Sequence, residues 1–209
     1  MAKKKSNKFN DDIVSNQIIS KYGGIVQGGE EVLEKLETFE TLSVSPSLDI
    51  ALGGGIREGN CVIIGGEPKT GKTTTALYFA AKCQALGKNI IYFNTEGRMT
   101  KENFTGIKGF DPKKIKIVQA TDEMPLVSAE IYLNSLETYV KNTPDLVAIV
   151  DSVSSMVPQE ELEGEIRTGV RNSLPRLMSM FLKRISGDVS RTKAILIFIL
   201  HNISNTGGS

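Results

Sequence analysis

The sequence contains the octapeptide Gly66-Glu67-Pro68-Lys69-Thr70-Gly71-Lys72-Thr73 between the apolar run 61–64 and the helix-compatible run 74–81. A strand, a glycine-bounded loop and a helix in this order are the context of a phosphate-binding loop. Glycine permits the tight backbone path, so that successive N–H groups and the helix N-terminus point at one anion. The stretch therefore predicts a nucleoside triphosphate site. Lys72 is expected to contact the β- and γ-phosphates, and the Thr73 hydroxyl is expected to be a ligand of Mg²⁺.

The composition is that of an ordinary globular chain of 209 residues, with 40% hydrophobic and 23% charged residues and a net charge of +1. This length accommodates one α/β domain with a small appendage, and the net charge gives no global signal for nucleic acid. Cys61 and Cys83 lie in apolar runs and are predicted to be reduced core residues, which fits an intracellular setting. No apolar run approaches the ~20 residues of a membrane span. We expect a soluble, cytoplasmic protein without a membrane partner.

Strand and helix patterns alternate along the chain without a hairpin signal, which predicts an α/β fold with a mostly parallel sheet and helices on both faces. A short helix is expected over residues 11–22, followed by a connector over residues 24–40 with one amphipathic turn region at Glu31–Leu36. Strands are expected at 89–94, 114–118, 146–151 and 192–200, and helices at 100–109, 123–140 and after Pro175. Residues 157–172 show no strong period and are expected to be a long loop. The predicted organisation is an N-terminal tail, helix and linker over 1–40 and an ATPase core over 41–209.

Two carboxylates are expected at the carboxyl ends of strands, where open α/β sheets bind ligands. Glu96 follows the strand at 89–94 and could orient a water for attack on the γ-phosphate, but an ordinary solvated glutamate fits its position equally well. Asp151 ends the apolar run 146–150 and is expected to hold Mg²⁺ opposite Thr73, the alternative being a residue that begins a turn.

Positive charge is concentrated over residues 167–193, where seven basic residues accompany a single acid, Asp188. A DNA-binding surface and a solvated helix face explain this stretch equally well. The strand at 192–200 delivers His201 to the same sheet edge as the phosphate loop. As the only histidine of the chain, His201 could contact the ligand or be a buried structural residue.

Several separated motifs resemble the bacterial RecA recombinases and their phage-encoded relatives, over roughly residues 12–209. They are the segment Ser47-Leu48-Asp49-Ile50-Ala51-Leu52-Gly53, the loop from Gly66 to Thr74 and the strand Val150-Asp151-Ser152-Val153. The most specific stretch is Glu161-Leu162-Glu163-Gly164-Glu165-Ile166, which resembles the opening of the family's first DNA-binding loop. Hexameric helicases and circadian-type ATPases share the nucleotide motifs of this fold but give no reason for that stretch.

The resemblance implies a role for each matching residue. Glu96 matches the catalytic glutamate, Lys72 acts with it, and Asp151 and Thr73 match the magnesium residues. His201 stands where the family usually has a glutamine that senses the γ-phosphate. The resemblance implies that the following residues contact ATP: Gly66, Glu67, Pro68, Lys69, Thr70, Gly71, Lys72, Thr73, Thr74 and His201. It further implies DNA contacts from Gly164, Arg167, Arg171 and Arg176, in the segment 163–176.

The sequence also departs from the family. Thr100 and Asn103 replace an aspartate and a tyrosine that contact adenine, and the second DNA loop after His201 is shortened or absent. The resemblance implies further strands and a small domain beyond Ser209, so the last core strand is expected to lack a sheet neighbour. The implied function is an ATP- and Mg²⁺-dependent recombinase that forms a homo-oligomeric helical filament on single-stranded DNA and pairs it with double-stranded DNA. The rival is an accessory protein that binds nucleotide and a recombinase partner without strand exchange.

Overall fold

The computed structural model describes residues 13–164 and 173–201, and the chain divides into two compact units, Met1–Glu40 and Thr41–Ser209. The N-terminal unit contains two helices, α1 (Ile13–Tyr22) and α2 (Gly29–Glu37). The connector expected over 24–40 is more regular than predicted, because its amphipathic region at Glu31–Leu36 belongs to the helix α2, which has Glu30 and Glu31 in its first turn. Neither helix contains a buried residue, so the described part of this unit has no core of its own.

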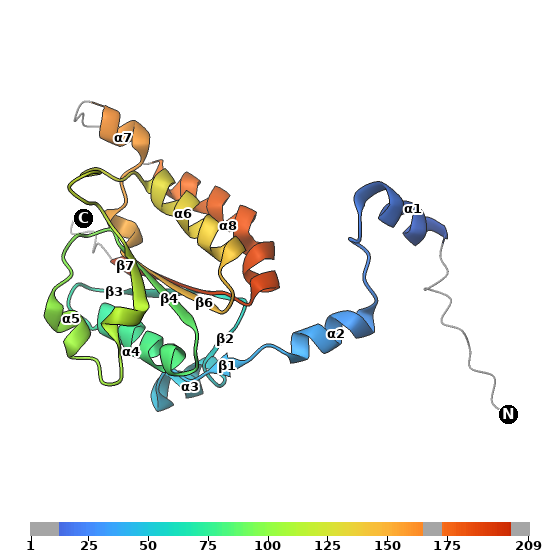
Figure 1. The fold of residues 1–209 in the computed structure, drawn as a ribbon, viewed down its shortest axis with the longest axis horizontal. Helices are drawn as coiled ribbons and strands as arrows, with labels where there is room; N and C mark the ends of the chain where they lie inside the picture. The colour runs from blue at the N-terminus through green and yellow to red at the C-terminus, as the bar shows by residue number, and fades with distance from the viewer. Residues whose placement is uncertain (1–12, 165–172, 202–209) are drawn as a thin grey trace, which may run out of the picture. The chain divides into compact units, whose positions relative to one another are not determined.

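A five-stranded parallel sheet forms the centre of the second unit, in the order β3-β7-β6-β4-β5 (Figure 1). Its strands are β3 (Cys61–Gly66), β4 (Asn89–Asn94), β5 (Ile115–Val118), β6 (Leu146–Asp151) and β7 (Ile195–His201). Every residue of β6 is buried, as is usual for a central strand of a parallel sheet. The predicted α/β class is therefore confirmed.

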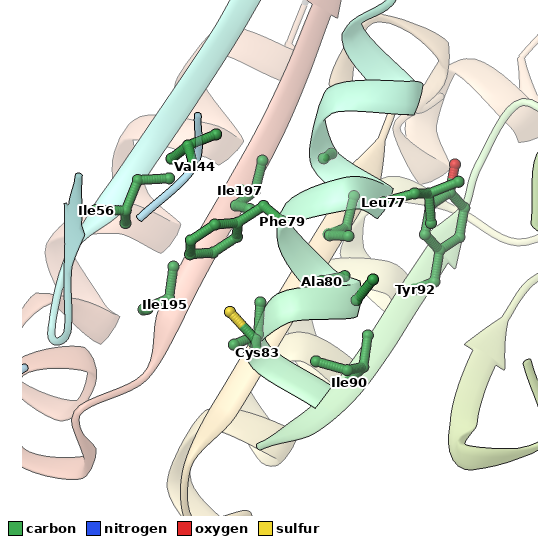
Figure 2. Close-up of a cluster of buried hydrophobic side chains, with 14 of the residues drawn as sticks. Val44, Ile56, Leu77, Phe79, Ala80, Cys83, Ile90, Tyr92, Ile195 and Ile197 are labelled. Atoms are coloured by element: carbon green, nitrogen blue, oxygen red, sulfur yellow. The ribbon is translucent and has the colours of Figure 1, made fainter. Parts of the chain in front are cut away.

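Helices cover both faces of this sheet, and Figure 1 shows α4 on one side with α6 and α8 on the other. The helix α4 (Lys72–Ala85) ends before Gly87, whose φ of 85° an L-residue rarely adopts. It packs on β4, β6 and β7 in a core that includes Phe79, Cys83 and Tyr92 (Figure 2). On the opposite face, α6 (Ala129–Asn142) and α8 (Leu174–Thr192) form the second core.

A small subdomain precedes the phosphate loop. It consists of β1 (Thr41–Leu42), α3 (Pro46–Leu52) and β2 (Ile56–Arg57), with β1 and β2 antiparallel. Ser45 caps α3 by accepting a hydrogen bond from the Leu48 N–H, and Gly53 ends it in the left-handed conformation.

Two further expectations about elements were wrong. The helix predicted over 123–140 begins only at Ala129, because Ser128 caps it and Pro125 lies in the preceding irregular segment. The described part of the predicted loop 157–172 contains α7 (Gln159–Glu163), and residues 165–172 lie outside the described ranges. The remaining short elements are α5 (Lys101–Thr105) and the 3₁₀ turns η1 (Pro112–Lys114) and η2 (Val153–Ser155).

The edge of the sheet also differs from expectation. The last strand β7 has two neighbours, β3 and β6, and the edge strands of the described sheet are the phosphate-loop strand β3 and the strand β5. Alternate residues of β3 are exposed, including Ile63 at 62%. Cys61 is consequently exposed rather than a core residue, whereas Cys83 is buried. Within the described ranges, no helix is both long and apolar enough to cross a membrane.

Candidate nucleotide-binding site

The carboxyl ends of four parallel strands meet at one edge of the sheet. Gly66 at the end of β3 pairs with His201 at the end of β7, and Asn94 at the end of β4 pairs with Asp151 at the end of β6. Glu96 follows β4 by two residues, and its N–H donates to the Asp151 carbonyl at 3.4 Å. This register brings together residues that are far apart in the sequence, at the edge where open α/β sheets bind ligands.

The loop between β3 and α4 turns tightly back on itself. Lys69 and Gly71 adopt positive φ values of 64° and 87°, and Thr70 Oγ1 donates to the Glu67 carbonyl at 2.8 Å. A Cβ on Gly66 would lie 3.2 Å from Thr70 Oγ1, so the first glycine of the motif is needed for a close approach.

The N-terminus of α4 is suited to binding an anion. Its N-cap is Gly71, which has no side chain to accept from the first N–H groups of the helix. Lys72 is 6% exposed, and its ammonium donates to the carbonyls of Gly66 at 2.9 Å and Glu67 at 2.6 Å. Phosphate oxygens are the ligands that such uncapped N–H groups and a loop lysine prefer.

Asp151 accepts two short hydrogen bonds on one carboxylate oxygen. Thr73 Oγ1 and the Tyr92 hydroxyl each donate to Asp151 Oδ2 at 2.6 Å. The predicted magnesium residues Thr73 and Asp151 are thus in direct contact. Tyr92 was not among the predicted site residues, because its position in an apolar strand is typical of a core residue.

Glu96 is held by three donors that also converge on one oxygen. Its Oε1 accepts from Ser152 Oγ at 2.9 Å and Ser155 Oγ at 3.3 Å, and it lies 2.6 Å from His201 Nε2. Desolvation alone raises the pKa of Glu96, but the hydrogen bonds from Ser152 and His201 outweigh it, so the net pKa lies below the usual value. Glu96 is therefore a carboxylate at neutral pH.

A cleft of about 630 Å³ lies between the phosphate loop, Glu96 and His201. It adjoins a smaller cavity of about 80 Å³ that contains Tyr92, Asn94, Met99, Asn103 and Asp151. The larger cleft is lined by Pro68, Lys69, Thr73, Thr95, Glu96, Arg98, Ser155 and His201. Thr74 is exposed on α4 and lines neither cavity. Arg98 and Ser155 are cleft residues that the sequence reasoning missed, although Arg98 stands only two positions after Glu96.

The side chains at this edge of the sheet offer ligand atoms for a divalent cation. One atom each from Glu96, Asp151 and His201 lies within 4.8 Å of the other two, and the Thr73 hydroxyl is bonded to Asp151. Carboxylate and hydroxyl oxygens are the ligands that Mg²⁺ prefers. Thr73 and Asp151 could therefore hold the ion beside the phosphate loop.

A groove of about 700 Å³ in the N-terminal unit does not compete with this assignment. Its lining includes Glu30, Glu31 and Glu34, whose charges would repel a triphosphate, and no lysine or arginine.

Comparison with known proteins gives the family. The model of the RecA N-terminal domain matches residues 12–207. The chain belongs to the RecA N-terminal domain family. Protein RecA of Chloroherpeton thalassium is 34% identical over 178 residues, which are 85% of this chain and 47% of that protein. Protein RecA of Roseiflexus castenholzii is 33% identical over 190 residues, covering 88% of this chain and 51% of that protein.

More distant relatives give the same picture. Protein RecA of Rippkaea orientalis is 29% identical over 189 residues, covering 90% of this chain and 52% of that protein. The chain spans about half the length of the curated relatives that it matches.

Of the residues expected to contact DNA, Gly164 and Arg176 are described by the structure, and neither lines the cleft. Gly164 follows α7 and is exposed, and Arg176 is exposed in the first turn of α8. Arg167 and Arg171 lie outside the described residues. Glu161 Oε1 accepts from the N–H and hydroxyl of Ser173, both at 3.3 Å, which ties α7 to the residue before α8.

Thr100 and Asn103, the two departures from the family near the base, have a local role. The Thr100 N–H donates to Asn103 Oδ1 at 2.7 Å, which caps the N-terminus of α5. Asn103 also lines the small cavity, together with Thr73, Glu96 and Asp151 of the candidate nucleotide site.

Proposed function

We propose that this chain is the ATPase core of a DNA recombinase. It binds ATP with Mg²⁺, hydrolyses ATP to ADP and phosphate, forms a helical filament on single-stranded DNA and promotes strand exchange. Its family and its curated relatives, each named Protein RecA, support this proposal. The observation that carries it is the convergence of Lys72, Thr73, Asp151 and Glu96 at one sheet edge, beside two cavities that both include Thr73 and Glu96 in their lining.

In this proposal the triphosphate lies along the loop 66–73 and the N-terminus of α4. Lys72 then exchanges its two carbonyl partners for the β- and γ-phosphate oxygens. Thr73 and Asp151 hold Mg²⁺, which neutralises charge on the phosphates when it is bound.

Glu96 is the catalytic carboxylate of the proposal. Its Oε1 accepts from its protein donors, while Oε2 accepts from none of the residues that the structure describes. Oε2 is therefore the oxygen that can accept a hydrogen bond from a water, orienting that water toward the γ-phosphorus.

Hydrolysis must be linked to DNA for this function. ATP can shift the equilibrium between two conformational states only as far as its affinities for the two states differ. An element that contacts both the γ-phosphate and the DNA-binding segments must therefore change between these states. His201 suits this task because it lies in the cleft, contacts Glu96 and ends β7. DNA is bound by the segment 163–176, and the N-terminal helix α1 docks on an adjacent subunit.

The test is the rate of ATP hydrolysis with and without single-stranded DNA, over a series of salt concentrations. We expect DNA to stimulate turnover, and the stimulation to fall steeply with salt because phosphate contacts release counterions. Lys72→Ala provides the background rate. ATP binding without any DNA response would contradict the recombinase proposal and favour the accessory role, which a filament-poisoning assay with a full-length RecA would then examine.

A further inference from the structure

The hydroxyl of Tyr92 is deeply buried and has one partner. Tyr92 is 2% exposed, lies in the core beneath α4 (Figure 2), and packs edge-on against Phe104 with ring centroids 6.4 Å apart. Its hydroxyl donates to Asp151 Oδ2 at 2.6 Å. A buried hydroxyl costs stability unless it is hydrogen-bonded, and a phenylalanine would fill the same apolar space without that cost. The bond to Asp151 is therefore the feature that distinguishes tyrosine from phenylalanine at this position.

The two donors to Asp151 come from different elements. Thr73 belongs to α4 and Tyr92 to β4, and both donate to the same oxygen, Oδ2. Two donors on one oxygen fix the plane of the carboxylate and its rotamer. Oδ1 accepts no hydrogen bond from any residue in the described ranges, so it is the oxygen available to the ion or to a water of its shell.

The two donors are not equivalent. Thr73 is itself an expected ligand of the ion, so its hydroxyl serves both the carboxylate and the metal. Tyr92 has no such second task, because its ring is locked in the core.

We propose that Tyr92 is a positioning residue for the magnesium site, whose buried hydroxyl holds Asp151 so that Oδ1 faces the ion. This inference rests on the proposed function, because it assumes that Thr73 and Asp151 receive Mg²⁺ with a nucleotide. It extends the site to a residue that acts on the ion only through Asp151. Partners of this kind typically contribute tenfold to a hundredfold to metal affinity.

The test is calorimetric binding of ADP to Tyr92→Phe and to the unchanged chain, first with a chelator and then with increasing Mg²⁺. We expect the ADP affinity without Mg²⁺ to stay within about twofold, because the loop and Lys72 are intact. The apparent affinity for Mg²⁺ in the ADP complex should fall about tenfold. The matched control is Tyr139→Phe, which changes a tyrosine that packs on Phe93 on the opposite face of the sheet.

Each outcome separates the inference from the function on which it rests. Suppose that the unchanged chain binds ADP and Mg²⁺, and that the ADP complex of Tyr92→Phe has the same apparent Mg²⁺ affinity. The inference is then overturned while the proposed function stands. An equal loss of ADP affinity with and without Mg²⁺ would also overturn it, by showing a general structural role. If the unchanged chain bound no nucleotide in either condition, the proposed function would fail and the inference with it.

Discussion

His201 Nε2 lies 2.6 Å from Glu96 Oε1, although the two residues are 105 positions apart in the chain. The contact joins the end of β7 to the segment after β4, and the His201 N–H donates in turn to Ser154 Oγ at 3.1 Å. His201 is thus attached to the proposed catalytic carboxylate by its side chain and to η2 by its backbone. A displacement of the end of β7 would therefore change the position or the hydrogen bonding of Glu96.

Replacing His201 tests this connection. We expect His201→Ala to lower DNA-stimulated ATP hydrolysis by about tenfold, because Glu96 loses a charge-assisted hydrogen bond. ADP affinity should not change, since the loop and Lys72 are untouched. His201→Gln is the matched variant, because its amide can still donate to Glu96 and should retain most of the stimulation. Equal stimulation of His201→Ala and the unchanged chain would contradict the connection.

Replacing Glu96 tests the chemical step. Glu96→Gln keeps the size of the side chain but removes the charge that orients the water, so we expect hydrolysis to fall by about a hundredfold or more. ATP-stabilised DNA binding should remain. Steady-state hydrolysis and a DNA-binding assay with ATP measure the two properties separately. The control is Glu102→Gln, a nearby exposed glutamate of α5. Hydrolysis by Glu96→Gln at the native rate would show that the catalytic assignment is wrong.

Local patterns predicted most of the fold and part of the site. The phosphate loop and the strands at 89–94 and 146–151 could be read from the sequence because glycine spacing and continuous apolar runs are local signals. The placement of Glu96 and Asp151 followed from the rule that parallel strands present their carboxyl ends together. The family resemblance then gave these residues their expected roles.

The remaining features depend on tertiary contacts. Nothing local marks Tyr92 as more than a core residue, because its significance is the approach of Asp151 from a strand 59 positions away. Ser155 and Arg98 join the cleft only once η2 and the segment after β4 are brought together. The exposure of Cys61 similarly depends on strand order, which places β3 at the sheet edge in the described chain.

Two glycines offer opposite predictions about stability. A Cβ at Gly55 would lie 2.2 Å from the Leu42 carbonyl oxygen, and its φ of 131° is unfavourable for alanine. Gly55→Ala should therefore reduce the free energy of unfolding by about 2 kcal/mol or more. Gly187 is exposed within α8, and a Cβ added there would meet no other atom within 4 Å. Gly187→Ala should therefore raise the free energy of unfolding by about 1 kcal/mol. Chemical denaturation compares the two variants, and a Gly55→Ala chain as stable as the original would contradict the geometry.

Glu137 gives a prediction about pH. It is 7% exposed on α6 and accepts hydrogen bonds from Lys141 at 2.6 Å and from Arg184 of α8 at 3.0 Å. The bond from Lys141 is the largest cause of a lowered pKa, and Arg184 adds to it against the effect of desolvation. Because the folded pKa lies below the unfolded value, the stabilisation is present above about pH 4.5 and is lost as the pH falls through the folded pKa.

The expected acid sensitivity can be measured as the unfolding temperature from neutral pH down to about pH 3. The unchanged chain should lose stability in the acid range, and Glu137→Gln should begin less stable at neutral pH but lose less on acidification. Glu123→Gln serves as the control, because this glutamate is exposed in the segment before α6. Parallel acid curves for Glu137→Gln and the unchanged chain would mean that the ion pairs between α6 and α8 contribute nothing measurable, as exposed partners often do. Since Lys141 and Arg184 are 44% and 60% exposed, added salt should also reduce the difference between the two curves.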